Sequence, residues 1–130
     1  MVIDTSAVIA ILRSEAAADR LIAAMEGTGA RRMSAASLVE AAIVLQARYG
    51  DPGERELDLL VQRARIDVIP VTGDQAEVAR SGFRRFGKGR HRAGLNFGDC
   101  FSYALAIGLG EPLLFVGTDF NQTDVTAAEY

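Results

Sequence analysis

Apolar and polar positions along the chain follow two periods that predict strands alternating with helices. The chain opens on a short apolar run, VI, which ends at an acid and two hydroxyls, Thr5 and Ser6. This pattern predicts a buried strand leading into a helix capped near these hydroxyls. Helical spacing of Ala, Leu and Ile then continues from about Ser6 to Arg13 and from Glu15 to Met25, until two glycines interrupt it.

The rest of the chain repeats this alternation. A second short strand is predicted over residues 31–33, and Ser34 or Ser37 then begins a helix that Gly50 ends. The pair Asp51-Pro52 opens another helix, because the fixed φ of proline suits a first turn. The next strand is predicted at IDVIPV, where Pro70 indicates an edge or a strand end. After it the pattern predicts, in order, a helix over Asp74–Phe86, a loop over Gly87–Asn96, a helix over Asp99–Gly108, a strand at PLLFVG and a final loop.

This alternation predicts an α/β protein with a mainly parallel sheet covered by helices on both faces, in one domain over residues 1–130. With 49% apolar residues the chain has enough material for a continuous core. We interpret the apolar N-terminus as the first structural element and not a signal peptide, since Asp4 interrupts it and no basic segment precedes it. No apolar run is long enough to cross a bilayer. The single cysteine, Cys100, excludes a Cys-rich zinc site and fits a reducing, cytoplasmic compartment.

The net charge of −3 by itself argues against a nucleic-acid binder, but the cations are unevenly distributed. A basic segment over residues 80–92 gathers Arg80, Arg84, Arg85, Lys88, Arg90 and Arg92 around the only histidine, His91. Cations gathered in one short stretch of an acidic protein indicate an anionic partner, with an ordinary solvated loop as the alternative.

Four acids occupy unusual positions. Asp4 and Asp119 each follow a predicted strand, and ligands of open α/β sheets collect at the carboxyl ends of the strands. Asp99 lies where a loop enters a helix, and Glu40 interrupts the apolar stretch SLVEAAIVL. Each position alone also fits a structural role, such as a helix cap, a turn or a solvated face.

Together, these acids favour a metal site. Carboxylates held close together repel one another, and a divalent cation relieves that repulsion. A set of carboxylates with no Cys and no useful His suits Mg²⁺ or Mn²⁺ better than zinc. Such an ion activates water and stabilises charge on a phosphodiester, whose backbone the basic segment would hold.

Four segments carry a resemblance to the PIN domain, namely IDTSAVIA, SLVEA, NFGDCFSYALA and LLFVGTDF. More closely, the chain resembles the VapC toxins, the ribonuclease half of type II toxin–antitoxin pairs. The resemblance implies a three-layer α/β/α fold, Mg²⁺-dependent endonucleolytic cleavage of RNA, homodimerisation and inhibition by a VapB-type antitoxin. By motif, the family's acids fall on Asp4, Glu40 and Asp99. The fourth corresponds best to Asp119, with Asp124 as the alternative.

The mechanistic hypothesis divides the roles among these acids. Asp4 and Asp99 hold the metal, while Glu40 and Asp119 complete the pocket, orient water or assist proton transfer. Ser6 either hydrogen-bonds a carboxylate or caps its helix. We expect Arg85, Lys88, Arg90 and Arg92 to bind RNA. His91 alone does not supply the pair of acid–base groups that a metal-free ribonuclease commonly uses.

Three other functions compete with this hypothesis. A phosphorylated receiver domain would have a lysine after a late strand, but the only lysine, Lys88, lies in the basic segment. A haloacid-dehalogenase-like phosphatase would have an acid at position 6, where Ser6 stands. A catalytically inert module that binds RNA or antitoxin stays open, and a cleavage assay with added divalent metal distinguishes it from an enzyme.

Overall fold

The computed structural model describes residues 1–130 and contains six α-helices, four short strands and one 3-10 helix. The elements are, in chain order, β1 (Val2–Ile3), α1 (Thr5–Leu12), α2 (Ala18–Glu26), β2 (Arg31–Ser34), α3 (Ala35–Tyr49), α4 (Asp51–Arg63), β3 (Ile66–Ile69), α5 (Gly73–Phe86), α6 (Phe97–Leu109), β4 (Leu113–Leu114) and η1 (Phe120–Gln122). The predicted alternation of strands and helices is confirmed. No helix combines the length and the apolar character needed to span a membrane.

The four strands form one parallel sheet in the order β3-β2-β1-β4. The parallel pairing confirms the predicted sheet type, and β3 lies at an edge, as Pro70 directly after it indicated. Because all strands run the same way, their carboxyl ends meet at one edge of the sheet. The segments that leave this edge include Asp4 after β1 and α3 after β2.

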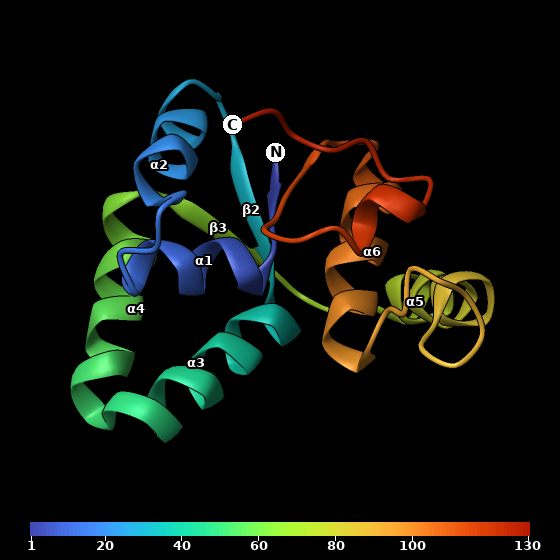
Figure 1. The fold of residues 1–130 in the computed structure, drawn as a ribbon, viewed down its shortest axis with the longest axis horizontal. Helices are drawn as coiled ribbons and strands as arrows, with labels where there is room; N and C mark the ends of the chain where they lie inside the picture. The colour runs from blue at the N-terminus through green and yellow to red at the C-terminus, as the bar shows by residue number, and fades with distance from the viewer.

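Helices cover both faces of the sheet, which confirms the predicted α/β/α layers (Figure 1). Successive residues of a strand point to opposite faces. Thus Ile3 and Leu114 join the core under α1 to α4, whereas Val2 and Leu113 join a second core under α5 and α6. All four side chains are fully buried. The two short neighbouring strands β1 and β4 therefore contribute to two separate hydrophobic cores, one on each face of the sheet.

Two helix starts differ from the sequence prediction. The predicted cap of α1 lay near Thr5 and Ser6, and the N-cap is the residue directly before them, Asp4, whose carboxylate accepts the hydrogen bond from Ser6 N–H. Helix α6 begins at Phe97, two residues before the predicted start, with Asn96 as its N-cap. In both places the chain uses an Asx side chain as the cap, which satisfies backbone donors that the first helical turn leaves free.

The close packing of α5 on α6 depends on Gly82. A Cβ atom at this position would lie 2.5 Å from ring carbon Cδ1 of the buried Tyr103. We expect Gly82→Ala to lower the free energy of unfolding by about 1–3 kcal/mol, because a methyl group forced into a packed core must displace it. Urea denaturation measures the change, with Gly73→Ala as a control because a Cβ there meets no atom within 4 Å. Equal stability of the two variants would contradict this packing.

Candidate active site at the carboxyl edge of the sheet

Asp4 is buried at the end of β1 with 3% of its surface exposed. Its Oδ2 accepts hydrogen bonds from Ser6 N–H at 2.9 Å and from Ser6 Oγ at 2.6 Å. Ser6 Oγ in turn accepts one from Val116 N–H at 3.0 Å. Ser6 thus both caps its helix and orients a carboxylate, and it ties Asp4 to the segment after β4. The second oxygen of Asp4, Oδ1, has no hydrogen-bond partner in the protein.

Asp99 lies in the first turn of α6 and is held by a capping box. Its Oδ2 accepts a hydrogen bond from Asn96 N–H at 2.9 Å, and its own N–H donates to Asn96 Oδ1 at 2.9 Å. Asp99 is therefore not the N-cap, which is Asn96, but it completes the capping box and uses only one of its two oxygens to do so. Its Oδ1 has no hydrogen-bond partner in the protein.

Glu40 extends from the second turn of α3 to the start of α6. Its carboxylate lies against Gly98, so closely that a Cβ atom at Gly98 would overlap it. The N-terminus of α6 carries partial positive charge, which favours the negatively charged side chains of Glu40 and Asp99 there. Glu40 is half-buried, so the interpretation of this acid as part of a fully solvated helix face is wrong.

Asp119 is exposed and precedes the 3-10 helix η1. It is close enough to Asp99 to raise the pKa of that carboxyl. The alternative fourth acid, Asp124, is engaged elsewhere, because it accepts hydrogen bonds from Tyr103 Oη at 2.9 Å and from Arg85 Nη1 at 3.0 Å. Of the two acids in this loop, only Asp119 is among the charges that raise the pKa of Asp99, and its assignment as the fourth acid stays a prediction.

The four acids Asp4, Glu40, Asp99 and Asp119, hereafter the acidic site, form one electrostatic unit. Burial, and to a lesser extent the negative charges of Asp4, Glu40 and Asp119, raise the pKa of Asp99 from 3.8 to about 6, against the lowering effect of the Asn96 N–H bond. Asp99 therefore carries an ionisation cost that the protein alone does not relieve.

This chemistry fits a hard divalent cation. All candidate donors are carboxylate oxygens, which Mg²⁺ prefers, and both Asp4 and Asp99 keep one oxygen free. As they stand, no three acidic, histidine or cysteine side chains converge closely enough to hold an ion. Repulsion between the negative charges of the carboxylates keeps these side chains apart, and a bound cation would remove that repulsion.

The raised pKa of Asp99 predicts a stability change in metal-free protein. The folded state disfavours the ionised form of Asp99 and favours the protonated form. The contribution of protonated Asp99 to the free energy of unfolding is therefore fully present below pH 3.8 and is lost as the pH rises through about 6. We expect Asp99→Asn to raise the free energy of unfolding in EDTA at pH 7.5 by about 1–2 kcal/mol, a value reduced for solvent screening of a half-buried charge.

Urea denaturation at pH 3.5 and pH 7.5 measures this change. At pH 3.5 the wild-type carboxyl is protonated, so the two proteins should have nearly equal stability. Asp67→Asn, at an exposed acid on β3, is the matched control and should show no gain at either pH. A wild type more stable than Asp99→Asn at pH 7.5 in EDTA would contradict the ionisation cost.

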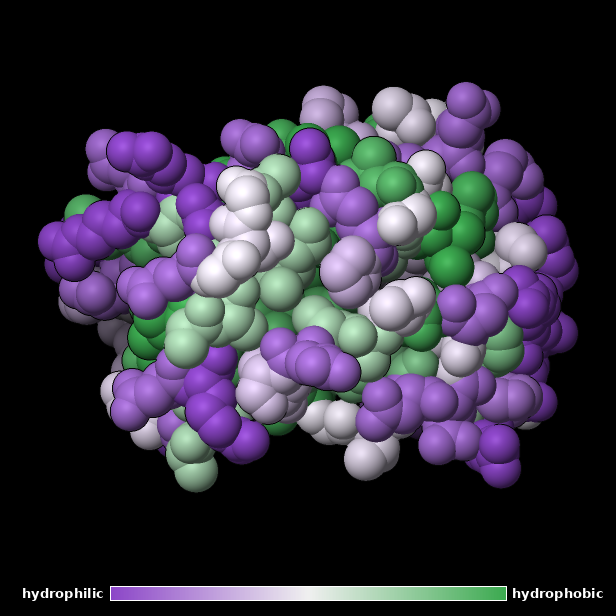
Figure 2. Space-filling view, turned by 90° about the horizontal axis from the view of Figure 1, so that it is seen from above, coloured by the Kyte–Doolittle hydropathy of each residue, from purple (hydrophilic) through white to green (hydrophobic).

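The basic segment lies at the α5 end of the molecule, where hydrophilic residues gather in the view from above (Figure 2). All six of its cations are exposed. Arg85 pairs with Asp124 and lies 4.6 Å from the ring centre of Phe86, so part of its charge is engaged within the protein. Lys88, Arg90 and Arg92 form no ion pair. Their predicted RNA binding stays a prediction.

His91 is a structural residue of this loop. Its Nδ1 accepts a hydrogen bond from Ala93 N–H at 3.0 Å, and its ring packs edge-on against Phe86. The side chain is half-buried and stabilises the loop that follows α5.

Three buried hydroxyl side chains join the helices of the acidic site, a connection that sequence reasoning missed. Thr5 Oγ1 donates to the Ser37 carbonyl at 3.1 Å, and the hydroxyls of Ser37 and Ser102 share a hydrogen bond of 3.1 Å. These contacts connect α1, α3 and α6, which carry or follow the acids. In the sequence, these residues are recognisable as small polar side chains at otherwise apolar helix positions.

Comparisons with known proteins agree with this architecture. Residues 1–125 match the PIN domain family. The chain is 57% identical over 125 residues to "Ribonuclease VapC30" of Mycobacterium tuberculosis (strain H37Rv), covering 96% of this chain and 95% of the relative. The crystal structure of VapC20 from M. tuberculosis, described as a Sarcin-Ricin loop cleaving toxin, superposes with a TM-score of 0.78 at 22% identity and covers 96% of this chain and 95% of the other. A toxin-antitoxin complex from Klebsiella pneumoniae superposes with a TM-score of 0.75 at 15% identity, over 99% of this chain and 97% of the other.

Proposed function

The chain belongs to the PIN domain family and to its VapC ribonucleases, and we propose that the acidic site hydrolyses RNA phosphodiester bonds with a divalent cation, Mg²⁺ or Mn²⁺. The observation that carries the proposal is the position of Asp99: it is partly buried, and Asp4, Glu40 and Asp119, from distant parts of the chain, lie close enough for their charges to raise its pKa as well. We assign the cation to Asp4 and Asp99, the two acids that each keep an oxygen free while a hydrogen bond fixes the other.

The bound cation would act as a Lewis acid on the phosphate and lower the pKa of an attacking water. The side chains of this protein orient the participants. Ser6 fixes Asp4, and Asn96 fixes Asp99, so both carboxylates are held before RNA arrives. Glu40, beside the N-terminus of α6, accepts the proton of the attacking water, and Asp119 completes the negative pocket. Attack by water leaves a 5′-phosphate and a 3′-hydroxyl and does not use the 2′-hydroxyl.

The partners follow from charge and family. The exposed cations of the basic segment, among them Lys88, Arg90 and Arg92, contact phosphates of the RNA, with Arg85 contributing beside its ion pair. The similarity to a known toxin-antitoxin complex supports regulation by a VapB-type antitoxin, and we propose that the protein acts as a homodimer in the cytoplasm, where RNA is available. According to this proposal, the protein is the toxin of a toxin–antitoxin pair.

The proposed function is tested by RNA cleavage at controlled metal concentration. We expect purified protein to cleave single-stranded RNA with Mg²⁺ or Mn²⁺, to lose activity in excess EDTA, and to recover it when the metal is restored. Mapping of the products should show 5′-phosphate ends. A 2′-deoxy nucleotide at the cleaved position should leave cleavage intact. Full activity in EDTA, or cyclic phosphate products, would show that the metal mechanism is wrong.

A further inference from the structure

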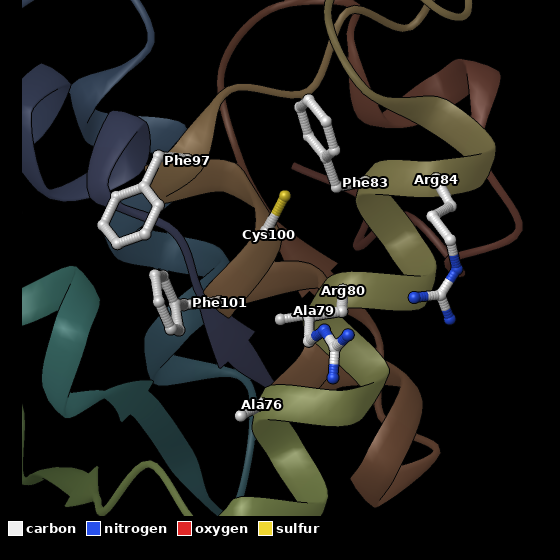
Figure 3. Close-up of a pocket in the computed structure, with 8 residues that line it drawn as sticks. All are labelled: Ala76, Ala79, Arg80, Phe83, Arg84, Phe97, Cys100 and Phe101. Carbon is white, nitrogen blue, oxygen red and sulfur yellow. The ribbon is translucent and has the colours of Figure 1, made fainter.

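A groove of about 690 Å³ lies between α5 and the first turns of α6 (Figure 3). Its α6 wall presents Phe97, Cys100 and Phe101, and its α5 wall presents Phe83 together with Arg80 and Arg84. The volume is within the range of small-molecule sites, which are concave and mostly apolar with a few polar groups. The proposed hydrolysis of RNA assigns no role to this groove.

The groove adjoins the acidic site across a single helical turn. Phe97 and Cys100 line it, and Asp99 lies between them in the same first turn of α6. The acidic site and the groove thus share the first turn of α6, and an RNA strand bound at the acidic site would have Phe97 within reach of a neighbouring nucleotide.

Phe97 is the most exposed large apolar side chain of the protein, with 80% of its surface accessible. Its ring packs edge-to-face on Phe101, with ring centres 4.9 Å apart, which orients it while leaving most of its surface open. A side chain this exposed contributes little to the core. An oriented aromatic ring that is open to solvent is suited to stacking against a flat partner.

The rim of the groove is positively charged. Arg80 pairs with Glu77, whereas Arg84 has no acidic partner within ion-pair distance. The guanidinium of Arg90 lies over the ring of Phe83, 5.7 Å from its centre, and brings a third cation to the α5 wall. Aromatic rings next to cations are the combination with which proteins bind single-stranded nucleic acid, because bases stack while phosphates pair with the cations.

We propose that this groove is a subsite for an unpaired nucleobase of the RNA, one or two nucleotides from the scissile phosphate. Phe97 is its stacking surface, and Arg84 binds the adjacent phosphate. The proposal rests on the proposed ribonuclease function and adds that the substrate is single-stranded beside the cleaved bond. Phe97 is thus a substrate-positioning residue, and its replacement is expected to raise KM more than it lowers kcat.

The test uses a single-stranded RNA whose cleavage position is mapped, prepared as a series with one stable abasic analogue at each nearby position. For wild type with Mg²⁺, we expect KM to rise roughly tenfold for one abasic position, the loss typical of one base–aromatic stack. Phe97→Leu should raise KM for the intact RNA by a similar factor and be insensitive to that abasic position. Phe97→Trp, which keeps an aromatic face, should retain the wild-type KM.

Leu109→Ala is the matched control, since Leu109 is an exposed apolar residue at the far end of the same helix. It should leave KM unchanged. Equal KM values and equal abasic profiles for wild type and Phe97→Leu would overturn the subsite while leaving the ribonuclease function intact. Unchanged RNA kinetics with lost inhibition by the antitoxin would also overturn it and assign the groove to a protein partner. Absence of cleavage by wild type at any divalent metal concentration would instead refute the proposed function.

Discussion

Replacing Asp4 or Asp99 by asparagine is expected to lower the rate of RNA cleavage by about 10²- to 10⁴-fold, the effect of losing several kcal/mol of metal-ion catalysis. Asparagine has the same shape, and its amide oxygen can still accept the hydrogen bond from Ser6 or from Asn96 N–H. The substitution therefore removes the negative charge and little else. Initial rates on a labelled single-stranded RNA with Mg²⁺ measure the loss, and circular dichroism checks the fold.

The control for this loss is an acid outside the site. Asp67 on β3 is exposed, and Asp67→Asn should cleave at the wild-type rate. Raising the Mg²⁺ concentration should recover part of the activity of Asp4→Asn and Asp99→Asn, because a weakened site is filled by mass action. A wild-type rate in either variant would remove that residue from the metal site. Equal losses in Asp67→Asn would indicate a general effect of charge.

The layers of the fold could be predicted from the sequence because hydrophobic periodicity reports burial directly. Strands as short as β1 and β4 were recognised because their apolar residues are followed by a helix signal or a loop signal. A parallel sheet places the carboxyl ends of β1 and β4 at one edge, so the sequence alone predicts that Asp4 and Asp119 lie near one another. The start of α6 was misplaced because Asp99 is itself a good N-cap residue, and the true cap, Asn96, stands three positions earlier.

The contacts inside the site could not be predicted from the sequence, because they depend on how closely two helices approach. Nothing in the pattern of α3 indicates that Glu40 meets Gly98 of α6. The choice between Asp119 and Asp124 likewise depends on a side-chain network, in which Arg85 and Tyr103 engage Asp124. The groove beside Phe97 cannot be predicted from the sequence either, since its two walls come from α5 and α6.

Gly98→Ala is expected to lower the rate of RNA cleavage by about 10²-fold without unfolding the protein. The added methyl group would overlap the Glu40 carboxylate and push it away from the first turn of α6. The backbone of Gly98 is helical, so alanine itself suits the position and offsets part of the cost of moving a side chain. The expected loss is that of a displaced proton-accepting group.

The same helix offers the matched control. A Cβ atom at Gly108 meets nothing within 4 Å, so Gly108→Ala should cleave at the wild-type rate and be slightly more stable, by about 0.5–1 kcal/mol. If Gly98→Ala acts only through Glu40, then adding it to Glu40→Gln should cause little further loss, because both changes remove the same group. Additive losses in the double variant would mean that Gly98 matters for another reason, such as direct approach of the RNA backbone to α6.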